Sequence, residues 1–222
     1  MRRISHDTYA TVFTVVYLGV VTNALLLVAS LPLVLLLVTT DPMTSWPLIA
    51  IAAPLCAPGI AAAFRVFREH SLGGTTPVRA FWAGIRATWA KALAIGVIGT
   101  ASIVVLFVDF RLVADAAIGV LVGPVLLVLA FVAVATTLLA LVGVAEEPGA
   151  RLRDILRAAA VLGMRRWYLT AVSLLALGAQ AWLFVSMPAI AMGLTASAAL
   201  YLAWANSRYS LRPVLDLEPA VA

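Results

Sequence analysis

The stretch AAIGVLVGPVLLVLAFVAVATTLLALVG, Ala116–Gly143, carries no charged residue, and it decides the class of fold. A helix needs about 20 apolar residues to cross the hydrocarbon core of a bilayer, so this stretch can cross it with a tilt. Further stretches of this kind lie on both sides of it: Thr11–Val38, Pro47–Phe67, Thr88–Val108, Trp167–Val185 and Pro188–Ala205. The sequence therefore predicts an all-α, polytopic membrane bundle of six transmembrane helices that form three helical hairpins.

The composition of the whole chain supports the same class. Of its 222 residues 64% are hydrophobic and 11% are charged, and the mean hydropathy is +1.09. Soluble domains carry about 25% charged residues, so a soluble enzyme and a disordered chain are both excluded. The single cysteine, Cys56, excludes an intramolecular disulfide. We expect one transmembrane domain over residues 1–222, with flexible ends at about 1–8 and 213–222.

The basic residues predict the orientation in the membrane. Of the 15 basic residues, only Arg111 falls in a connection on the opposite side. Cytoplasmic loops are enriched in Lys and Arg, so both termini are predicted to be cytoplasmic, and the net charge of +5 needs no nucleic-acid partner. The preference for Arg over Lys, with much Ala and Val, is typical of a GC-rich bacterial genome and favours a bacterial plasma membrane. The residues on the predicted cytoplasmic side are Arg2, Arg3, Arg65, Arg68, Arg79, Arg86, Lys91, Arg151, Arg153, Arg157, Arg165, Arg166, Arg208 and Arg212.

Two cytoplasmic connections, residues 77–89 and 150–164, have helical hydrophobic periodicity. Apolar residues such as Phe81 and Ile85 in the first, and Ile155 in the second, recur on one face, with arginines on the other. The sequence therefore predicts two cytoplasmic interfacial amphipathic helices. Tryptophan and basic side chains favour the lipid headgroup level, which makes the following residues candidate interfacial anchors: Trp82, Trp89, Lys91, Arg165, Arg166 and Trp167.

Prolines interrupt the first two predicted membrane helices. Pro32 lies in the first, and Pro54 and the pair Pro58-Gly59 lie in the second. Each proline within a helix removes a backbone hydrogen bond, and the freed carbonyl needs a partner because the bilayer core holds no water. A static kink is the favoured interpretation, and a helix break that lines a solute pathway is the alternative.

Asn23 and Gln180 are the leading polar candidates within the predicted membrane helices. Hydrogen bonds between helices are the favoured interpretation of both, and a transport pathway is the alternative. We expect the first two membrane helices to pack together around Pro32, Pro58 and Gly59. Asn23 should point inward to a hydrogen-bond partner.

No motif in the sequence predicts catalysis. His6 and His70 are the only histidines, no residue pair has metal-ligand spacing, and no glycine-rich phosphate loop occurs. We therefore expect no catalytic site, no cofactor and no metal. Gly119 and Gly123 have the GxxxG spacing, which permits close helix contact within the chain or with a second copy.

Several segments resemble a known family. Asn23–Pro32 (NALLLVASLP) is similar to the first-helix N-x-L-W-…-S-L-P signature of the YesL-like bacterial integral membrane proteins, with Leu26 in place of the tryptophan. Ala57–Phe64 (APGIAAAF) resembles the family's G-P-A-x-A-A-L-Y segment, and Phe81–Arg86 (FWAGIR) its F-W-x-x-F-R helix. The resemblance extends over about Thr11–Asp216, nearly the whole chain.

The resemblance implies an auxiliary role in carbohydrate uptake, because genes of this family often lie beside those of sugar ABC importers. It carries no functional residue over to this chain. The leading hypothesis is an accessory or scaffold component that contacts the lipid bilayer and the permease or ATPase subunits of a carbohydrate ABC importer, with a homo-oligomer also open. The alternatives are a stand-alone small-solute transporter or channel and, third, a membrane-embedded enzyme.

Overall fold

The computed structural model describes residues 6–215, with side chains described over 13–211, so the predicted flexible ends lie largely outside the described residues. Helices make up the described chain, which contains no strand, and the all-α prediction is confirmed. The elements are α1 (His6–Ala29), α2 (Leu31–Thr39), α3 (Pro42–Ala52), η1 (Ala53–Cys56), α4 (Ala57–Ser71), α5 (Pro77–Val113), α6 (Gly119–Glu146), α7 (Leu152–Arg165), α8 (Trp167–Ser186), α9 (Pro188–Ile190), η2 (Ala191–Thr195) and α10 (Ala196–Leu215).

Within the described chain, five helical segments are long and apolar enough to cross a membrane, and a bent pair of helices makes the sixth. The bent pair consists of α1 and α2, which meet at Ser30 with an angle of 76°. The six predicted membrane helices therefore all have a helical counterpart, but the first is sharply broken. The five segments are Pro42–Ser71, Pro77–Val113, Gly119–Glu146, Trp167–Ser186 and Pro188–Leu211.

The structure differs from the sequence prediction in the first of the two amphipathic segments. Residues 77–89 do not form a separate interfacial helix, because they are the first part of α5, which continues without a break for 37 residues. At 1.5 Å per residue such a helix is about 55 Å long, well beyond the roughly 30 Å of a bilayer core. No proline follows Pro77 within this helix, and alanines at 87, 90, 92 and 94 favour its continuation.

The second amphipathic segment forms a helix of its own, α7, as predicted. Its residues Ile155, Ala159 and Leu162 are buried against the bundle, while Arg153 and Arg157 remain exposed. The side chain of Ile155 packs on Gly143 of α6. This face thereby joins the cytoplasmic connection to the membrane domain.

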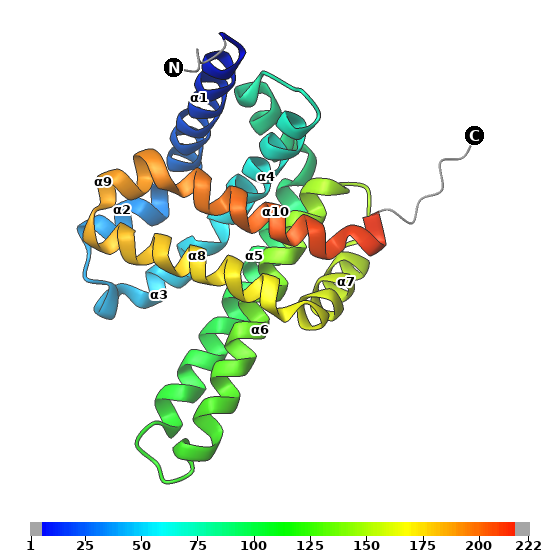
Figure 1. Ribbon diagram of the computed structural model, residues 1–222. Coiled ribbons are helices and arrows are strands. Elements are labelled where there is room, and N and C mark those ends of the chain that lie inside the picture. The colour runs from blue at the N-terminus through cyan, green and yellow to red at the C-terminus, as the bar shows by residue number, and fades with distance from the viewer. Residues whose placement is uncertain (1–5, 216–222) are drawn as a thin grey trace, which may run out of the picture.

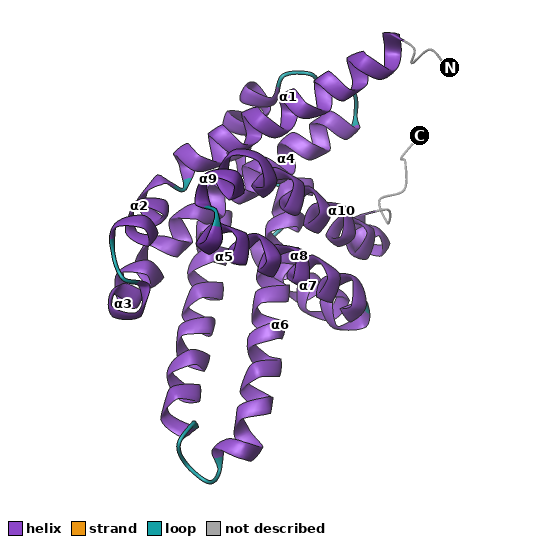
Figure 2. Ribbon diagram, turned by 60° about the vertical axis from the view of Figure 1, so that its left-hand side comes forward, coloured by secondary structure: helices purple, strands orange, loops and turns teal. Residues whose placement is uncertain are grey.

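The connections between helices lie around the periphery of the molecule (Figures 1 and 2). The described ends of α1 and α10 lie along the top and right of Figure 1, together with the α4–α5 and α6–α7 connections. The α2–α3 and α5–α6 connections and α9 lie along the left and bottom.

Helix α4 forms the centre of the bundle. Its small side chains allow the neighbouring helices to approach it closely. Ala61, Ala62 and Ala63 are fully buried. Gly59 lies against Ala29 of α1, so close that an added Cβ would stand 2.7 Å from the Ala29 Cβ. The predicted packing of the first two membrane helices around Gly59 is therefore confirmed.

The tip of the α5–α6 hairpin extends beyond the rest of the bundle (Figure 2), although Trp46 of α3 contacts Phe107 in the far half of α5, with their ring centroids 6.1 Å apart. Beyond Gly99, α5 has no buried residue, and Gly123 is the only buried residue of α6 before Ala135. Gly123 faces the ring of Phe110 on α5, and a side chain on Gly119 would collide with the carbonyl of Val113. Both glycines of the GxxxG motif therefore serve contacts inside the hairpin.

Gly96→Ala should destabilise the bundle, because the new Cβ would stand 2.7 Å from the Ala57 Cβ and 3.0 Å from the Pro54 carbonyl oxygen. Overpacking of this kind costs about 1–3 kcal/mol. The matched control is Gly178→Ala on α8, where the new methyl group meets open space and improves helix propensity by up to about 1 kcal/mol. Unfolding in detergent micelles, followed by circular dichroism, should separate the two variants; equal stability would contradict the packing.

Candidate functional site

A crevice of about 230 Å³ lies at the bend of the first membrane helix. Residues of α1, α2, α4, α8, η2 and α10 line it, and most of their side chains are aliphatic. Its polar lining consists of Asn23, Ser30 and Gln180. The two amides that the sequence singled out are thus brought to one place.

Asn23 connects α1 to the last membrane segment. Its side-chain Nδ2 donates to the Gly193 carbonyl (2.9 Å), and its Oδ1 accepts from the Ser197 backbone N–H (2.6 Å). These two backbone groups are four residues apart, the spacing of an α-helical hydrogen bond. The Asn23 side chain is 2% exposed. Its amide thus bonds both backbone groups at the place where the hydrogen-bonding pattern of the helix is interrupted. The inward orientation predicted for Asn23 is confirmed.

Gln180 supports the same segment from the other side. Its Nε2 donates to the Ala191 carbonyl (2.8 Å), and its Oε1 accepts from the Thr195 hydroxyl (2.7 Å). Ala191–Thr195 is the π-helical segment η2, whose wider turns leave backbone groups poorly matched. Both amides act as hydrogen-bonding partners between helices, the interpretation that the sequence favoured.

The three prolines that the sequence singled out lie at the starts of helices, whereas Pro47 and Pro124 lie inside α3 and α6. Pro32 is in the first turn of α2, Pro54 in the first turn of η1 and Pro58 in the first turn of α4. A proline costs no backbone hydrogen bond there. The carbonyl of Pro54, which Pro58 was expected to free, accepts from the Ala57 N–H instead. These prolines mark junctions between short helices.

A buried carboxylate that sequence reasoning did not single out joins three helices. Glu146, at the end of α6, is 5% exposed. Its Oε2 lies 3.4 Å from Nε of Arg68 on α4 and 3.6 Å from Nε of Arg208 on α10, and its Oε1 accepts from the Trp204 indole N–H (2.9 Å). Arg208 also lies over the Trp204 ring. In the sequence, the one indication of this site is a glutamate that directly follows a long apolar run.

The predicted interfacial anchors divide into two groups. Lys91 donates from Nζ to the carbonyls of Pro148 (2.6 Å) and Ala150 (2.7 Å), which ties α5 to the α6–α7 connection. Arg166 donates to the Tyr209 carbonyl (2.7 Å) and lies over its ring. These two side chains hold the bundle together, whereas the remaining anchors are exposed: Trp82, Trp89, Arg165 and Trp167.

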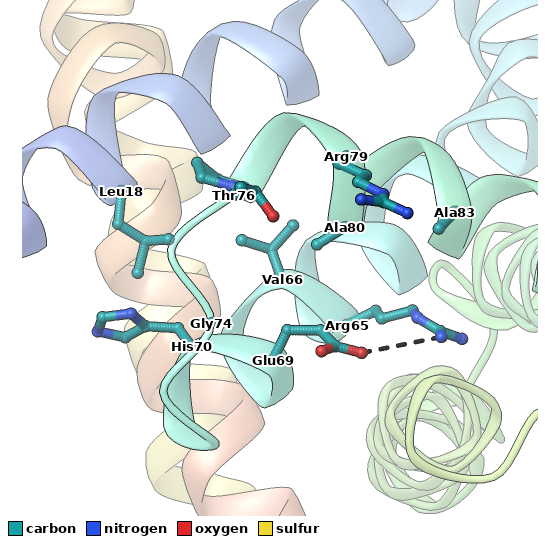
Figure 3. Close-up of a pocket in the computed structure, with 11 residues that line it drawn as sticks. Leu18, Arg65, Val66, Glu69, His70, Gly74, Thr76, Arg79, Ala80 and Ala83 are labelled. Atoms are coloured by element: carbon teal, nitrogen blue, oxygen red, sulfur yellow. Dashed lines mark ion pairs between the residues drawn. The ribbon is translucent and has the colours of Figure 1, made fainter.

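A second pocket, of about 220 Å³, lies between α4 and the start of α5 (Figure 3). Its charged lining residues are Arg65, Glu69 and Arg79, with His70 at one side. Arg65 pairs with Glu69 across 3.8 Å, and the Nε of Arg65 is buried without a hydrogen-bond partner among the described residues.

Asn23→Leu should destabilise the last membrane segment at the point where its helical hydrogen bonding is broken. It leaves the Ser197 N–H and the Gly193 carbonyl without their side-chain partners, and an unsatisfied buried polar group costs about 1–3 kcal/mol. We expect lower stability in micelles and faster hydrogen exchange at the Ser197 amide. Val20→Leu, at an exposed position of the same helix, serves as the control. Unchanged exchange at Ser197 in the Asn23 variant would contradict this role.

Glu146→Gln should lower the free energy of unfolding by about 1.5–3 kcal/mol, the range for hydrogen bonds to charged groups. The amide can still accept from Trp204, but it removes the charge that Arg68 and Arg208 share. The matched control is Glu147→Gln, because Glu147 is the exposed neighbour and makes no ion pair with the described side chains. If both substitutions have the same effect, Glu146 does not join the helices electrostatically.

Comparison of the chain with protein-family models, with curated proteins and with solved structures finds no match. Among the described residues, no group of three or more His, Cys, Asp or Glu side chains is placed to hold a metal ion. The structure therefore shows membrane-spanning helices, amide side chains that are hydrogen-bonded within the chain, and a pocket lined by arginines. It is an integral, multi-pass membrane protein in contact with the lipid bilayer.

Proposed function

We propose that this membrane protein is an accessory or scaffold subunit, and that its partner is the permease of a carbohydrate ABC importer in a bacterial plasma membrane. The observation that carries the proposal is the far half of the α5–α6 hairpin. Between Gly99 and Ala135 its two arms bury only Gly123. Apart from the contact of the arms with each other and that of Phe107 with Trp46 of α3, their apolar side chains are largely exposed. A scaffold needs such a surface, because contacts used for its own folding are not available to a partner.

The hydrogen bonding of the polar side chains within the membrane domain favours a scaffold protein over a protein that conducts a solute. Asn23 and Gln180 use their amides to hold η2. Polar groups that conduct a solute must be able to exchange partners with it, whereas these side chains are committed to the backbone of a neighbouring helix. Their arrangement favours a rigid body that presents a surface.

The resemblance to the YesL-like family supplies the class of assembly in this proposal. It rests on the segments 23–32, 57–64 and 81–86. In the structure these segments are the end of α1, the start of α4 and the early part of α5. The segments thus contribute residues to the core of the bundle, and the role is proposed from the resemblance itself.

A stand-alone transporter or channel is the second candidate, and the crevice at the α1–α2 bend favours it. The bend of 76° places a broken membrane helix beside this crevice, and broken helices line the substrate sites of many transporters. Solute flux into liposomes that contain only the purified chain distinguishes this candidate from a scaffold, which conducts nothing alone.

Photo-crosslinking in native membranes tests the scaffold proposal. A photoreactive amino acid at Leu121 (76% exposed) samples the far hairpin, and one at Leu175 of α8 (73% exposed) samples an equally exposed position on the body. We expect an adduct at position 121 whose partner is identified by mass spectrometry as an ABC permease subunit, and no such adduct at position 175.

Two results of this crosslinking experiment would contradict the scaffold proposal. If position 121 yields only lipid adducts in cells that express the importer at its natural level, the hairpin does not contact a permease and the proposal fails. A permease adduct of equal yield at both positions would also count against it, because random collisions in the membrane label all exposed positions alike.

A further inference from the structure

We propose that the pocket between α4 and the start of α5 binds a phosphate group, as in the headgroup of an anionic lipid. The pocket holds about 220 Å³ and combines polar and apolar walls. The apolar wall includes Leu18, Val66 and Ala80, and the polar wall includes Arg65 and Arg79 (Figure 3). This inference is independent of the proposed scaffold function.

The first argument is the unmet hydrogen-bonding capacity of Arg65. Its Nε is buried and has no partner among the described residues, and its one ion pair, to Glu69, is long at 3.8 Å. Buried polar groups are nearly always hydrogen-bonded, and leaving one unpaired is costly. The Arg65 side chain as a whole is 22% exposed and lines the pocket. Its terminal N–H groups, rather than the buried Nε, are therefore the ones that a ligand oxygen can reach, and the planar fork of arginine suits phosphate.

The second argument is the charge balance of the lining. Arg65 and Arg79 contribute two positive charges against the single carboxylate of Glu69. Arg79 is exposed and forms no ion pair with the described side chains. The excess of positive charge favours an anion. Since the Glu69 side chain is 42% exposed, it can turn into solvent when an anion takes its place beside Arg65.

The start of α5 adds to these two arginines. Thr76, its N-cap, makes no side-chain hydrogen bond to the first turn. The first backbone N–H groups of a helix have no partner within the helix, and the helix dipole makes this end positive. Thr76 and Pro77 line the pocket, so the helix terminus reinforces the field of the two guanidinium groups.

The place of the pocket in the molecule points to lipid as the source of the phosphate. It lies where the end of α4 and the start of α5 face Leu18 of α1, on the side predicted to be cytoplasmic. Basic pockets between membrane helices on that side bind anionic headgroups. The apolar wall then accommodates the part of the lipid next to its phosphate.

The test measures lipid binding to the purified full-length chain by native mass spectrometry in detergent. Phosphatidylglycerol is titrated against zwitterionic phosphatidylcholine, and inorganic phosphate is tested separately by thermal shift. Arg65→Gln and Arg79→Gln should each weaken phosphatidylglycerol binding about ten-fold, in line with the loss of a charged hydrogen bond. Glu69→Gln should strengthen it, because the competing carboxylate is removed. Arg79 is exposed, so its variant reports on binding even if the Arg65 variant fails to fold.

Arg153→Gln is the matched control, since it removes one exposed arginine from α7, outside the pocket. If Arg153→Gln weakens binding as much as Arg79→Gln, the attraction is a general effect of net charge and the site is refuted. The same pattern of variants with inorganic phosphate, but not with phosphatidylglycerol, would support the site and assign it to a soluble phosphate. No dependence on Arg65, Glu69 or Arg79 with either probe would overturn the inference.

Discussion

Where a membrane helix is broken, its unpaired backbone N–H and C=O groups have no water to bond in the hydrocarbon core. The arrangement of the helices in this chain follows from the side chains that serve as partners for these groups. The break at η2 is the clearest case. Asn23 on α1 and Gln180 on α8 each bond two groups of the segment that begins at Ala191 and ends at Ser197. Three helices are thereby held in one register, and the crevice beside the α1–α2 bend takes its shape from them.

The same need for partners explains the opposite end of the bundle. Glu146 ends α6, where the helix dipole disfavours a negative charge, yet it is nearly fully buried. Two guanidinium groups and an indole N–H compensate for its loss of water. Since Arg68 comes from α4 and Arg208 from α10, the carboxylate joins helices that are far apart in the chain. Lys91 performs a related task for the carbonyls of the α6–α7 connection.

These bonds divide the molecule into a body and an arm. The body contains α4 and the internally bonded polar groups, and the arm is the far half of the α5–α6 hairpin, which buries almost nothing. The exposed apolar side chains of this arm are the surface on which the proposed scaffold function rests. The Arg65–Arg79 pocket lies on the body, at the start of α5, whereas the tip of the arm lies at the other end of that helix. Contact with lipid headgroups and contact with a partner can therefore take place at the same time.

The sequence by itself determined the class of fold, the positions of the membrane helices and the division of the loops into two groups. These properties depend on the length of apolar runs and on the placement of charge along the chain, both of which are local. It also identified Asn23 and Gln180, because an amide in an apolar run requires a partner. It divided 77–113 into two helices where there is one, since an amphipathic pattern next to an apolar run does not reveal whether the helix continues.

Only the tertiary structure decided which groups meet. The partners of Asn23 lie 170 and 174 residues away in the sequence, and no periodicity encodes such a pairing. Glu146 looked like the polar end of a membrane helix, and its role depends on where α4 and α10 cross α6. The pocket of Arg65 and Arg79 likewise forms because α4 and α5 pack closely through small residues. Contacts between distant segments depend on the packing of whole helices in three dimensions, and for that reason they could not be derived from the pattern of any one of them.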